Sequence, residues 1–417
     1  MEKLDSTTTE PGSVFIDATE RARLHMRRAE RIKACIGPQT YKWARRARPL
    51  FNMPYLMGRV WVRGFEHMPL FTEPAPILAF AHKKIHDVCV VTNFLMARPL
   101  ERFHNLTLVA QGGLFNGIYP WRDLTPAFIQ RSFLRRPAAA LARLLGRGIS
   151  FFMRVVNANP VFREGSDLPT TPEAYNHHSF AGELIMGMPH ADFVKFANRE
   201  TRNSVINTQR ELVELNRTFV IFPEGIYMHD GAIAETQDLT GVAAFRKRRA
   251  VHFISMTYDE LCPDRLGRID AWLDIAPLAG PPTGREDIAD FLAAGRKQLQ
   301  DNSVITASHL IALALNELRE REKFTRAELV ERFEQLAART IQSPLLFDPN
   351  LAREEYRRDR LKRFLRSRSR WFRRKGNDLY PRRDEMQKFL ESERTVDDIT
   401  WNCNNVRHAA DYLTAGA

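Results

Sequence analysis

The chain has 417 residues, of which 44% are hydrophobic, and this length and composition predict a globular protein with one sizeable domain plus appendages. Its formal net charge of +12 favours an anionic partner, a class that includes membrane surfaces, nucleic acids and phosphorylated substrates. The four cysteines form no CxxC pair, so the sequence predicts a reducing compartment, no disulfide framework and no metal site.

The N-terminal part of the chain is basic and predicts contact with a lipid surface. The first residues are acidic and polar, which is not typical of a secretory signal. Residues 19–48 have a helical pattern in which Trp43 lies beside Arg45 and Arg46, a mixture that suits a water–lipid interface. The most apolar stretch, 138–156, is interrupted by arginines. We therefore expect a cytoplasmic protein that is peripherally associated with the membrane.

Short apolar runs rich in β-branched and aromatic residues then alternate with longer helical patterns, which predicts an α/β sheet covered on both faces. The strands are expected at 59–64, 76–81, 106–111, 218–224, 251–258 and 270–276, and helices at 191–216, 285–300, 307–322 and 326–340. From these patterns we predict a basic segment over residues 1–50, a main α/β domain over 51–302 and a helical extension over 303–417.

Residues 79–91 read AFAHKKIHDVCVV, which sets His82 five positions before Asp87 after an apolar run. On one continuous helix the two side chains would point about 140° apart and could not touch. They meet only if a strand delivers His82 to a turn and Asp87 lies in the first turn of the following helix. Asp87 would then fix the tautomer of His82 and leave the other ring nitrogen to take a proton from a hydroxyl. His86 is a competing partner, and a shared surface turn is the alternative interpretation.

Two further stretches carry polar groups next to apolar runs. Residues 218–231, TFVIFPEGIYMHDG, place Glu224 and a glycine where an apolar strand ends, and α/β sheets bind ligands at such ends. The alternative is an ordinary strand exit with a solvated glutamate. In NANPVFREGSD, residues 157–167, Arg163 has a guanidinium that suits a phosphate, with a surface ion pair as the alternative.

The order VWVRGFEHMP, an apolar strand, HxxxxD, NPVFRE, VIFPEG and VHFISMTY resembles the glycerolipid acyltransferase family that includes the 1-acylglycerol-3-phosphate acyltransferases. This resemblance implies an α/β fold with a central mixed sheet flanked by helices. It implies that His82 is the general base and that Asp87 orients it. It also implies that the acceptor binds near Arg163, Phe222, Pro223, Glu224 and Gly225.

The activity that the resemblance implies is transfer of an acyl chain from acyl-CoA or acyl carrier protein to a hydroxyl of a lysophospholipid acceptor, 1-acylglycerol 3-phosphate, in phospholipid synthesis. No cofactor beyond the thioester donor is implied. The chain departs from the family pattern at Ala81, where asparagine is usual, at 226–228, where Thr-Arg-Ser is usual, and at Gln111, where a lysine is often found. Most of these changes remove cations near the acceptor phosphate, so glycerol 3-phosphate and other lysolipids are alternative acceptors.

Residues 356–375, the basic tract, contain 11 Lys and Arg against one acidic residue. Apolar residues in the tract form roughly one helical stripe, which predicts either an anionic membrane surface as partner or a helix docked on its own domain. Nucleic-acid binding is not expected, because no nucleic-acid-binding motif accompanies the charge. The rival to an enzyme is a non-catalytic, basic membrane-binding or nucleic-acid-binding protein on a decayed acyltransferase fold. The residues predicted to bind a membrane are Trp43, Arg45, Arg46, Arg363, Arg366, Arg370 and Trp371.

Overall fold

The structure is a computed structural model, and it describes residues 57–68, 75–84, 87, 90–91, 94, 106–112, 115, 129, 133–155, 158–162, 189–214, 216–225, 228–386 and 394–414. The chain divides into two compact units. The smaller unit includes residues 105–217, and the larger unit comprises 42–104 and 218–417. The boundary predicted near residue 302 lies inside the larger unit.

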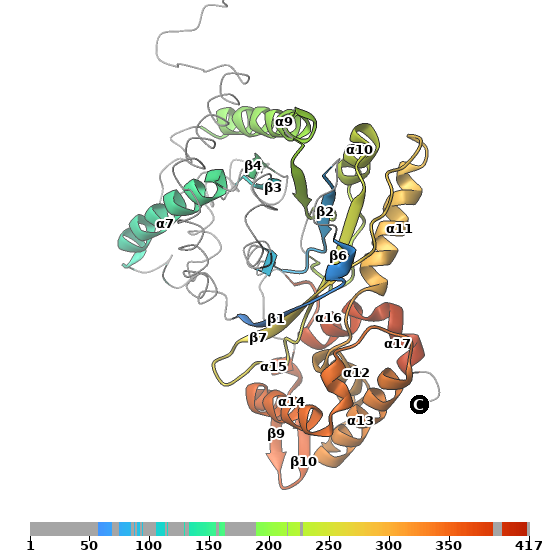
Figure 1. Cartoon of the computed structure of the whole chain (residues 1–417). Coiled ribbons are helices and arrows are strands. Elements are labelled where there is room, and N and C mark those ends of the chain that lie inside the picture. The colour runs from blue at the N-terminus through green and yellow to red at the C-terminus, as the bar shows by residue number, and fades with distance from the viewer. Residues whose placement is uncertain are drawn as a thin grey trace, which may run out of the picture. The chain divides into compact units, whose positions relative to one another are not determined.

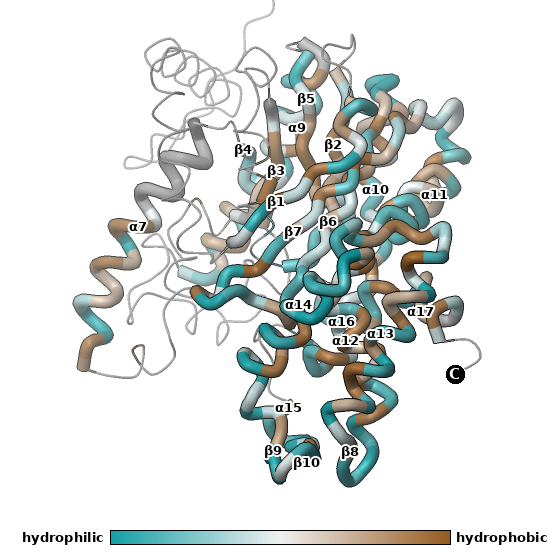
Figure 2. The backbone as a smooth tube through the Cα atoms, turned by 60° about the horizontal axis from the view of Figure 1, so that its bottom comes forward, coloured by the Kyte–Doolittle hydropathy of each residue, from teal (hydrophilic) through white to brown (hydrophobic). Residues whose placement is uncertain are grey.

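The larger unit contains a mixed sheet whose strands follow the order β1 (Met57–Arg63), β7 (Ile269–Ile275), β6 (Val251–Tyr258), β2 (Ile77–Phe80) and β5 (Thr218–Ile221). β6 and β7 are antiparallel, whereas β1 pairs with β7, and β2 with both β6 and β5, in parallel. All residues of β2 and β6 are buried, and the apolar runs of β2 and β5 appear brown in Figure 2. Continuous apolar strands are typical of a sheet covered by other elements.

Helices flank this sheet (Figure 1). α10 (Asp238–Lys247) and α11 (Ile288–Asp301) pack against each other, and α11 lies so close to β6 that a Cβ on Gly295 would overlap the ring of Phe253. The predicted fold class, α/β with a central mixed sheet flanked by helices, is therefore confirmed. Its consequence for a site is that the carboxyl ends of β2, β5 and β6, which are parallel neighbours, meet at one edge.

The smaller unit pairs two parallel strands, β3 (Leu106–Gln111) and β4 (Ala158–Val161). α9 (His190–Glu214) packs on both strands, and α7 (Arg135–Val155) packs on β4. Ala139 and Ala142 of α7 meet the rings of Phe162 and Phe193 in a small apolar cluster. One face of α7 is thus fixed to its own unit by small residues.

The C-terminal part of the larger unit is helical around a second core, as predicted. α13 (Arg326–Gln342) begins at Thr325, whose side chain and that of Glu328 form a reciprocal capping box. The other helices are α12 (Ala307–Leu318), α14 (Glu354–Ser367), α15 (Arg383–Met386), α16 (Asp398–Asn405) and α17 (Arg407–Thr414), and a small sheet joins β8 (Phe324–Thr325), β10 (Asp378–Pro381) and β9 (Phe372–Lys375).

Candidate active site

His82 and Asp87 lie together after the end of β2. The strand ends at Phe80, His82 follows in an irregular turn, and Asp87 lies in a helical segment. His82 Nδ1 is 2.9 Å from Asp87 Oδ2, and Asp87 is fully buried while His82 is partly exposed. The predicted contact is therefore confirmed, and the interpretation as a shared surface turn is wrong. His86, the competing partner, lies outside the described residues.

The carboxylate of Asp87 is held on both oxygens. Oδ2 also accepts hydrogen bonds from the backbone N–H groups of Lys83 and Lys84, and Oδ1 accepts one from the hydroxyl of Tyr258 at the end of β6. A carboxylate with this many donors cannot rotate, so it fixes the imidazole as the tautomer that carries its proton on Nδ1. Proton exchange with a substrate then falls to Nε2. Tyr258 was missed from sequence, although its position at the end of a strand next to β2 is a usable signal.

The segment after β5 lies against the same histidine. The ring of Phe222 stacks on the imidazole, with ring centroids 4.1 Å apart and planes 19° from parallel. Glu224 Oε1 accepts the backbone N–H of His82 at 3.2 Å, and the backbone N–H of Met228 donates to the carbonyl of His82 at 3.0 Å. Gly225 permits this close turn because its φ of 76° lies in the left-handed region.

The structure thus brings Phe222, Pro223, Glu224 and Gly225 next to His82, because β2 and β5 are parallel neighbours. Glu224 is fully buried, so the alternative of a solvated glutamate is wrong. Binding of an acceptor by these four residues stays a prediction. Arg163, the predicted phosphate ligand, lies outside the described residues.

Two buried ionisable groups lie beneath the histidine. Burial raises the pKa of Glu224 to about 8, and burial lowers the pKa of Lys83 to about 8 despite the nearby charges of Asp87 and Glu224. Glu224 Oε2 meets no hydrogen-bond partner within the described part of the chain. Near neutral pH the Glu224 carboxyl is therefore largely protonated, and Lys83 supplies the positive charge beside the Asp87 carboxylate.

The C-terminal helices contact this turn directly, which the sequence did not predict. Lys83 Nζ donates to Asn405 Oδ1 at 2.6 Å, and Trp401 Nε1 donates to the carbonyl of Met228 at 2.9 Å. Gly231, with a φ of 87°, lies so close to the carbonyl of Trp401 that any side chain there would overlap it. α16 therefore contacts both the turn that contains His82 and the segment that follows β5. No short-range pattern could reveal contacts between residues more than 170 positions apart.

A buried charge cluster extends this support. Glu260 Oε1 binds Lys84 Nζ at 2.9 Å and Arg394 Nη2 at 2.7 Å, and Arg394 also binds Asp398 at 2.7 Å. Burial would raise the pKa of Glu260, but the charges of Lys84 and Arg394 hold it well below its ordinary value. Because the backbone N–H of Lys84 donates to Asp87, this cluster is joined to the histidine–aspartate pair by one residue.

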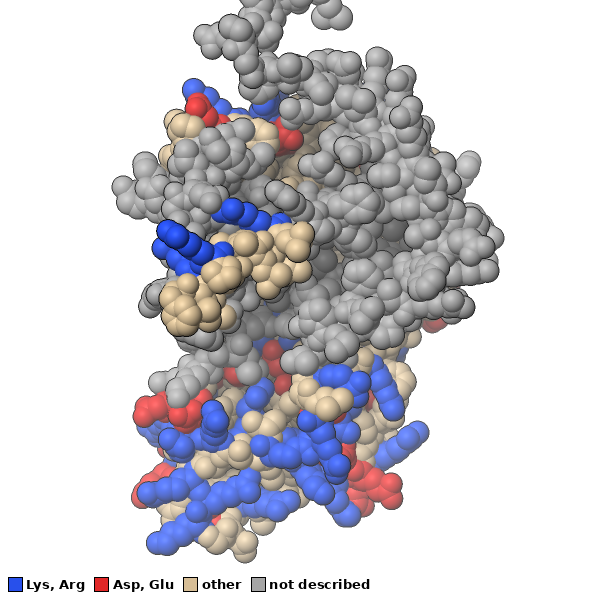
Figure 3. Space-filling view, turned by 90° about the vertical axis from the view of Figure 1, so that its left-hand side faces the viewer, with Lys and Arg blue, Asp and Glu red and all other residues tan. Residues whose placement is uncertain are grey.

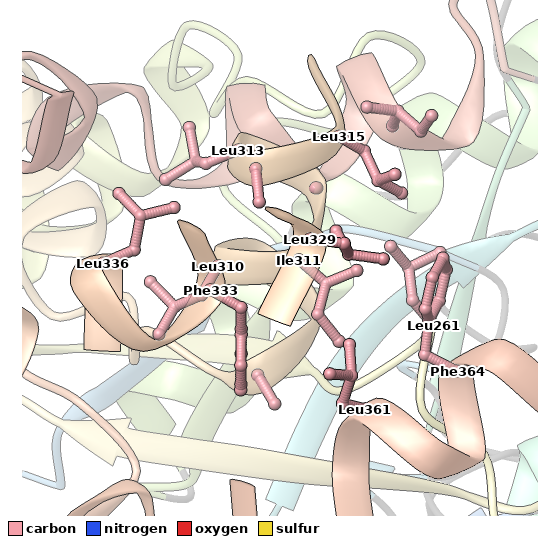
Figure 4. Packing of buried hydrophobic residues seen from close by; sticks show 14 of the residues in the cluster. Leu261, Leu310, Ile311, Leu313, Leu315, Leu329, Phe333, Leu336, Leu361 and Phe364 are labelled. Carbon is pink, nitrogen blue, oxygen red and sulfur yellow. The ribbon is translucent and has the colours of Figure 1, made fainter. Parts of the chain in front are cut away.

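The basic tract turns its apolar stripe inward. Lys and Arg side chains gather at the bottom of Figure 3, at the level of α14, α15, β9 and β10. Leu361 and Phe364 nevertheless belong to the C-terminal core, where they point towards Leu329 and Ile311 of the neighbouring helices (Figure 4). Trp371 packs edge-to-face on Phe364 and is also buried. The structure thus matches the alternative of a helix docked on its own domain.

This packing corrects the prediction that Trp371 is an apolar membrane anchor, because its ring is enclosed by its own core. Arg363 pairs with Asp359 at 2.7 Å, whereas Arg366 and Arg370 are exposed. Membrane binding by these charges stays a prediction. Trp43, Arg45 and Arg46 lie outside the described residues. Within the described ranges, no helix is long and apolar enough to span a bilayer, and no cluster of His, Cys, Asp and Glu suits a metal ion.

No family model and no curated protein matches the sequence. Among solved structures, the chain is similar to the 1-acyl-sn-glycerophosphate (LPA) acyltransferase PlsC from Thermotoga maritima, with a TM-score of 0.34 and 14% sequence identity. The match covers 67% of this chain and 88% of the other. At this level the likeness does not carry a functional assignment, which depends on the geometry around His82.

Proposed function

We propose that the chain is an acyltransferase that moves an acyl chain from a thioester donor, acyl-CoA or acyl carrier protein, to a hydroxyl of a glycerolipid. The observation that carries this proposal is the contact of His82 Nδ1 with the buried, multiply bonded carboxylate of Asp87. A base oriented in this way is what the attack of a hydroxyl on a thioester requires.

The reaction is a direct transfer. His82 Nε2 takes the proton of the acceptor hydroxyl as its oxygen attacks the thioester carbonyl. The C–S bond then breaks, the ester is released, and the leaving thiolate takes the proton from His82 Nε2, which restores the neutral imidazole. Asp87 stabilises the imidazolium that forms in the transition state, and stacking on Phe222 restrains the ring.

Glu224 has a structural part in this proposal. Its carboxyl accepts a hydrogen bond from the backbone N–H of His82, so Glu224 positions the histidine and takes no part in the proton transfer.

The acceptor that we propose is 1-acylglycerol 3-phosphate, with Arg163 as the residue that binds the phosphate. A charge-assisted hydrogen bond contributes about 1.5–3 kcal/mol, so Arg163→Ala should raise the Michaelis constant for this acceptor by about 10- to 100-fold. Hydrolysis of the donor should change little.

The test is steady-state thiol release by wild type and Arg163→Ala with lysophosphatidate, glycerol 3-phosphate and an uncharged lysolipid. Wild-type activity only with the uncharged lipid would refute the proposed acceptor but not the reaction. No thiol release with any acceptor and either donor would refute the acyltransferase and favour the non-catalytic rival.

A further inference from the structure

Helix α7 exposes a row of leucines. The exposed fractions of Leu141, Leu144 and Leu145 are 58%, 64% and 49%, and Phe133, just before the helix, is 92% exposed. Their spacing of three and four residues places the leucines on one helical face. In Figure 2 the coloured part of α7 alternates between brown and teal, whereas the small residues Ala139 and Ala142 face the core of the unit.

This row is a patch and not scattered exposure. Twelve large hydrophobic residues in the described part of the chain are exposed, and five of them lie between residues 133 and 145. The others include single residues such as Ile206 in α9 and Leu266 between β6 and β7. Isolated exposed side chains are normal on a protein surface, but a contiguous apolar patch indicates a binding surface.

The charge on α7 indicates the kind of partner. The helix contains five arginines and no acidic residue or lysine. Arg136, Arg143, Arg147 and Arg154 recur at intervals of 7, 4 and 7 residues, which places their Cα atoms in one narrow strip. Blue and tan side chains lie side by side at the level of α7 in Figure 3. The helix therefore combines an exposed apolar row with a sequence whose only charged residues are arginines.

We propose that α7 docks the protein on an anionic lipid surface. The leucine row would enter the boundary between head groups and acyl chains, while the exposed Arg136 would lie among lipid phosphates. A second copy of the chain is disfavoured as the occupant, because two such helices would bring together segments that contain arginines and no acidic residue. Docking would serve the proposed function because it brings the enzyme to its lipid substrate. Membrane binding can still be tested independently, because it requires no catalysis.

The experiment is co-sedimentation of the full chain with vesicles of phosphatidylcholine alone and of equimolar phosphatidylcholine and phosphatidylglycerol, without an acyl donor. Leu141→Gln/Leu144→Gln should lower binding to the anionic vesicles by about 10-fold or more, because two apolar side chains no longer enter the lipid. Ile206→Gln/Leu266→Gln, equally exposed but outside α7, is the matched control and should bind like wild type. Thermal unfolding of all variants checks that each one folds, and Leu145→Gln alone provides a milder second variant.

Charge is tested separately. Arg136→Gln should weaken binding to anionic vesicles by about fivefold and to neutral vesicles hardly at all, with the difference lost at high salt. Wild-type binding by both leucine variants, or equal loss in the matched control, would overturn the proposal. Loss of binding only in Arg366→Gln/Arg370→Gln would instead assign the anchor to the basic tract. A wild-type dimer that Leu141→Gln/Leu144→Gln dissociates would assign the patch to a second copy.

Discussion

Asp259 and Glu260 are neighbours after the end of β6, yet their buried carboxylates hold different parts of the protein. Asp259 shares Arg360 of the basic tract with Asp270, and burial raises its pKa in spite of that arginine. Glu260 has two cations, Lys84 and Arg394, which hold its pKa well below the ordinary value against the effect of burial. The Arg360 cluster has two carboxylates for one cation, whereas the Glu260 cluster has two cations for two carboxylates, Glu260 and Asp398.

The difference separates a docking contact from a contact that supports the site. Arg360 attaches α14 to the sheet, and nothing in its cluster contacts His82 or Asp87 among the described residues. Lys84, in contrast, donates its backbone N–H to Asp87 and lies over the ring of Tyr258, which also binds Asp87. Replacing Arg360 should therefore mainly lower stability, whereas replacing Lys84 should mainly lower turnover.

The largest effect is expected from Arg360→Met. Removal of this cation leaves two carboxylates with no other ion-pair partner among the described residues, and breaking a buried pair in this way costs about 3–5 kcal/mol. Urea denaturation followed by the fluorescence of the buried tryptophans measures the loss. Turnover per folded molecule should stay near that of wild type, and a marked fall in it would show that the basic tract also supports the site.

Lys84→Met is the matched change in the other cluster. The stability loss should be smaller than in Arg360→Met, because Glu260 keeps Arg394. Turnover should fall by about 10-fold, since small displacements of a catalytic group are costly. The measurement is thiol release at saturating donor and acceptor, well below the unfolding temperature. Unchanged turnover would contradict the proposal that the Glu260 cluster supports Asp87.

The effect expected from Glu224 is smaller over any single pH unit and appears only when the pH is varied. Its pKa is raised from 4.5 to about 8, so between these values the folded chain holds a proton that the unfolded chain has released. Stability should therefore fall as pH rises from about 5 to 8, by up to about 1.4 kcal/mol per pH unit. Glu224→Gln keeps an oxygen for the backbone of His82 and should lack this slope. The difference between the two denaturation profiles isolates the contribution of Glu224, and parallel profiles would contradict it.

The sequence predicted what depends on periodicity and on strand ends. The six expected strands correspond to β1, β2, β3, β5, β6 and β7, and the helix start at Thr325 follows from its capping residues. The meeting of His82 with Asp87 and Glu224 was accessible because parallel neighbouring strands end at the same edge. β4 escaped prediction because its sequence, ANPV, contains Pro160 and is not a run of β-branched or aromatic residues.

What could not be predicted depends on long-range packing. Asn405, Trp401 and Arg394 reach the site from the end of the chain, and no local pattern encodes that. The sequence also did not show which face of an amphipathic helix is buried in the protein. The basic tract and α7 both combine arginines with apolar residues, but α14 buries its large side chains and α7 buries its alanines. Which face meets the core is decided by the partner surface and not by the segment.

The most direct test of the proposed acyltransferase is a double-mutant cycle on His82 and Asp87. Turnover in acyl transfer is measured for wild type, His82→Ala, Asp87→Ala and the double variant. If the aspartate acts only through the histidine, His82→Ala should lower turnover by about 10²- to 10⁴-fold, and the double variant should lose hardly more. A His82→Ala variant with wild-type turnover, or a double variant whose loss is the product of the two single losses, would contradict the account.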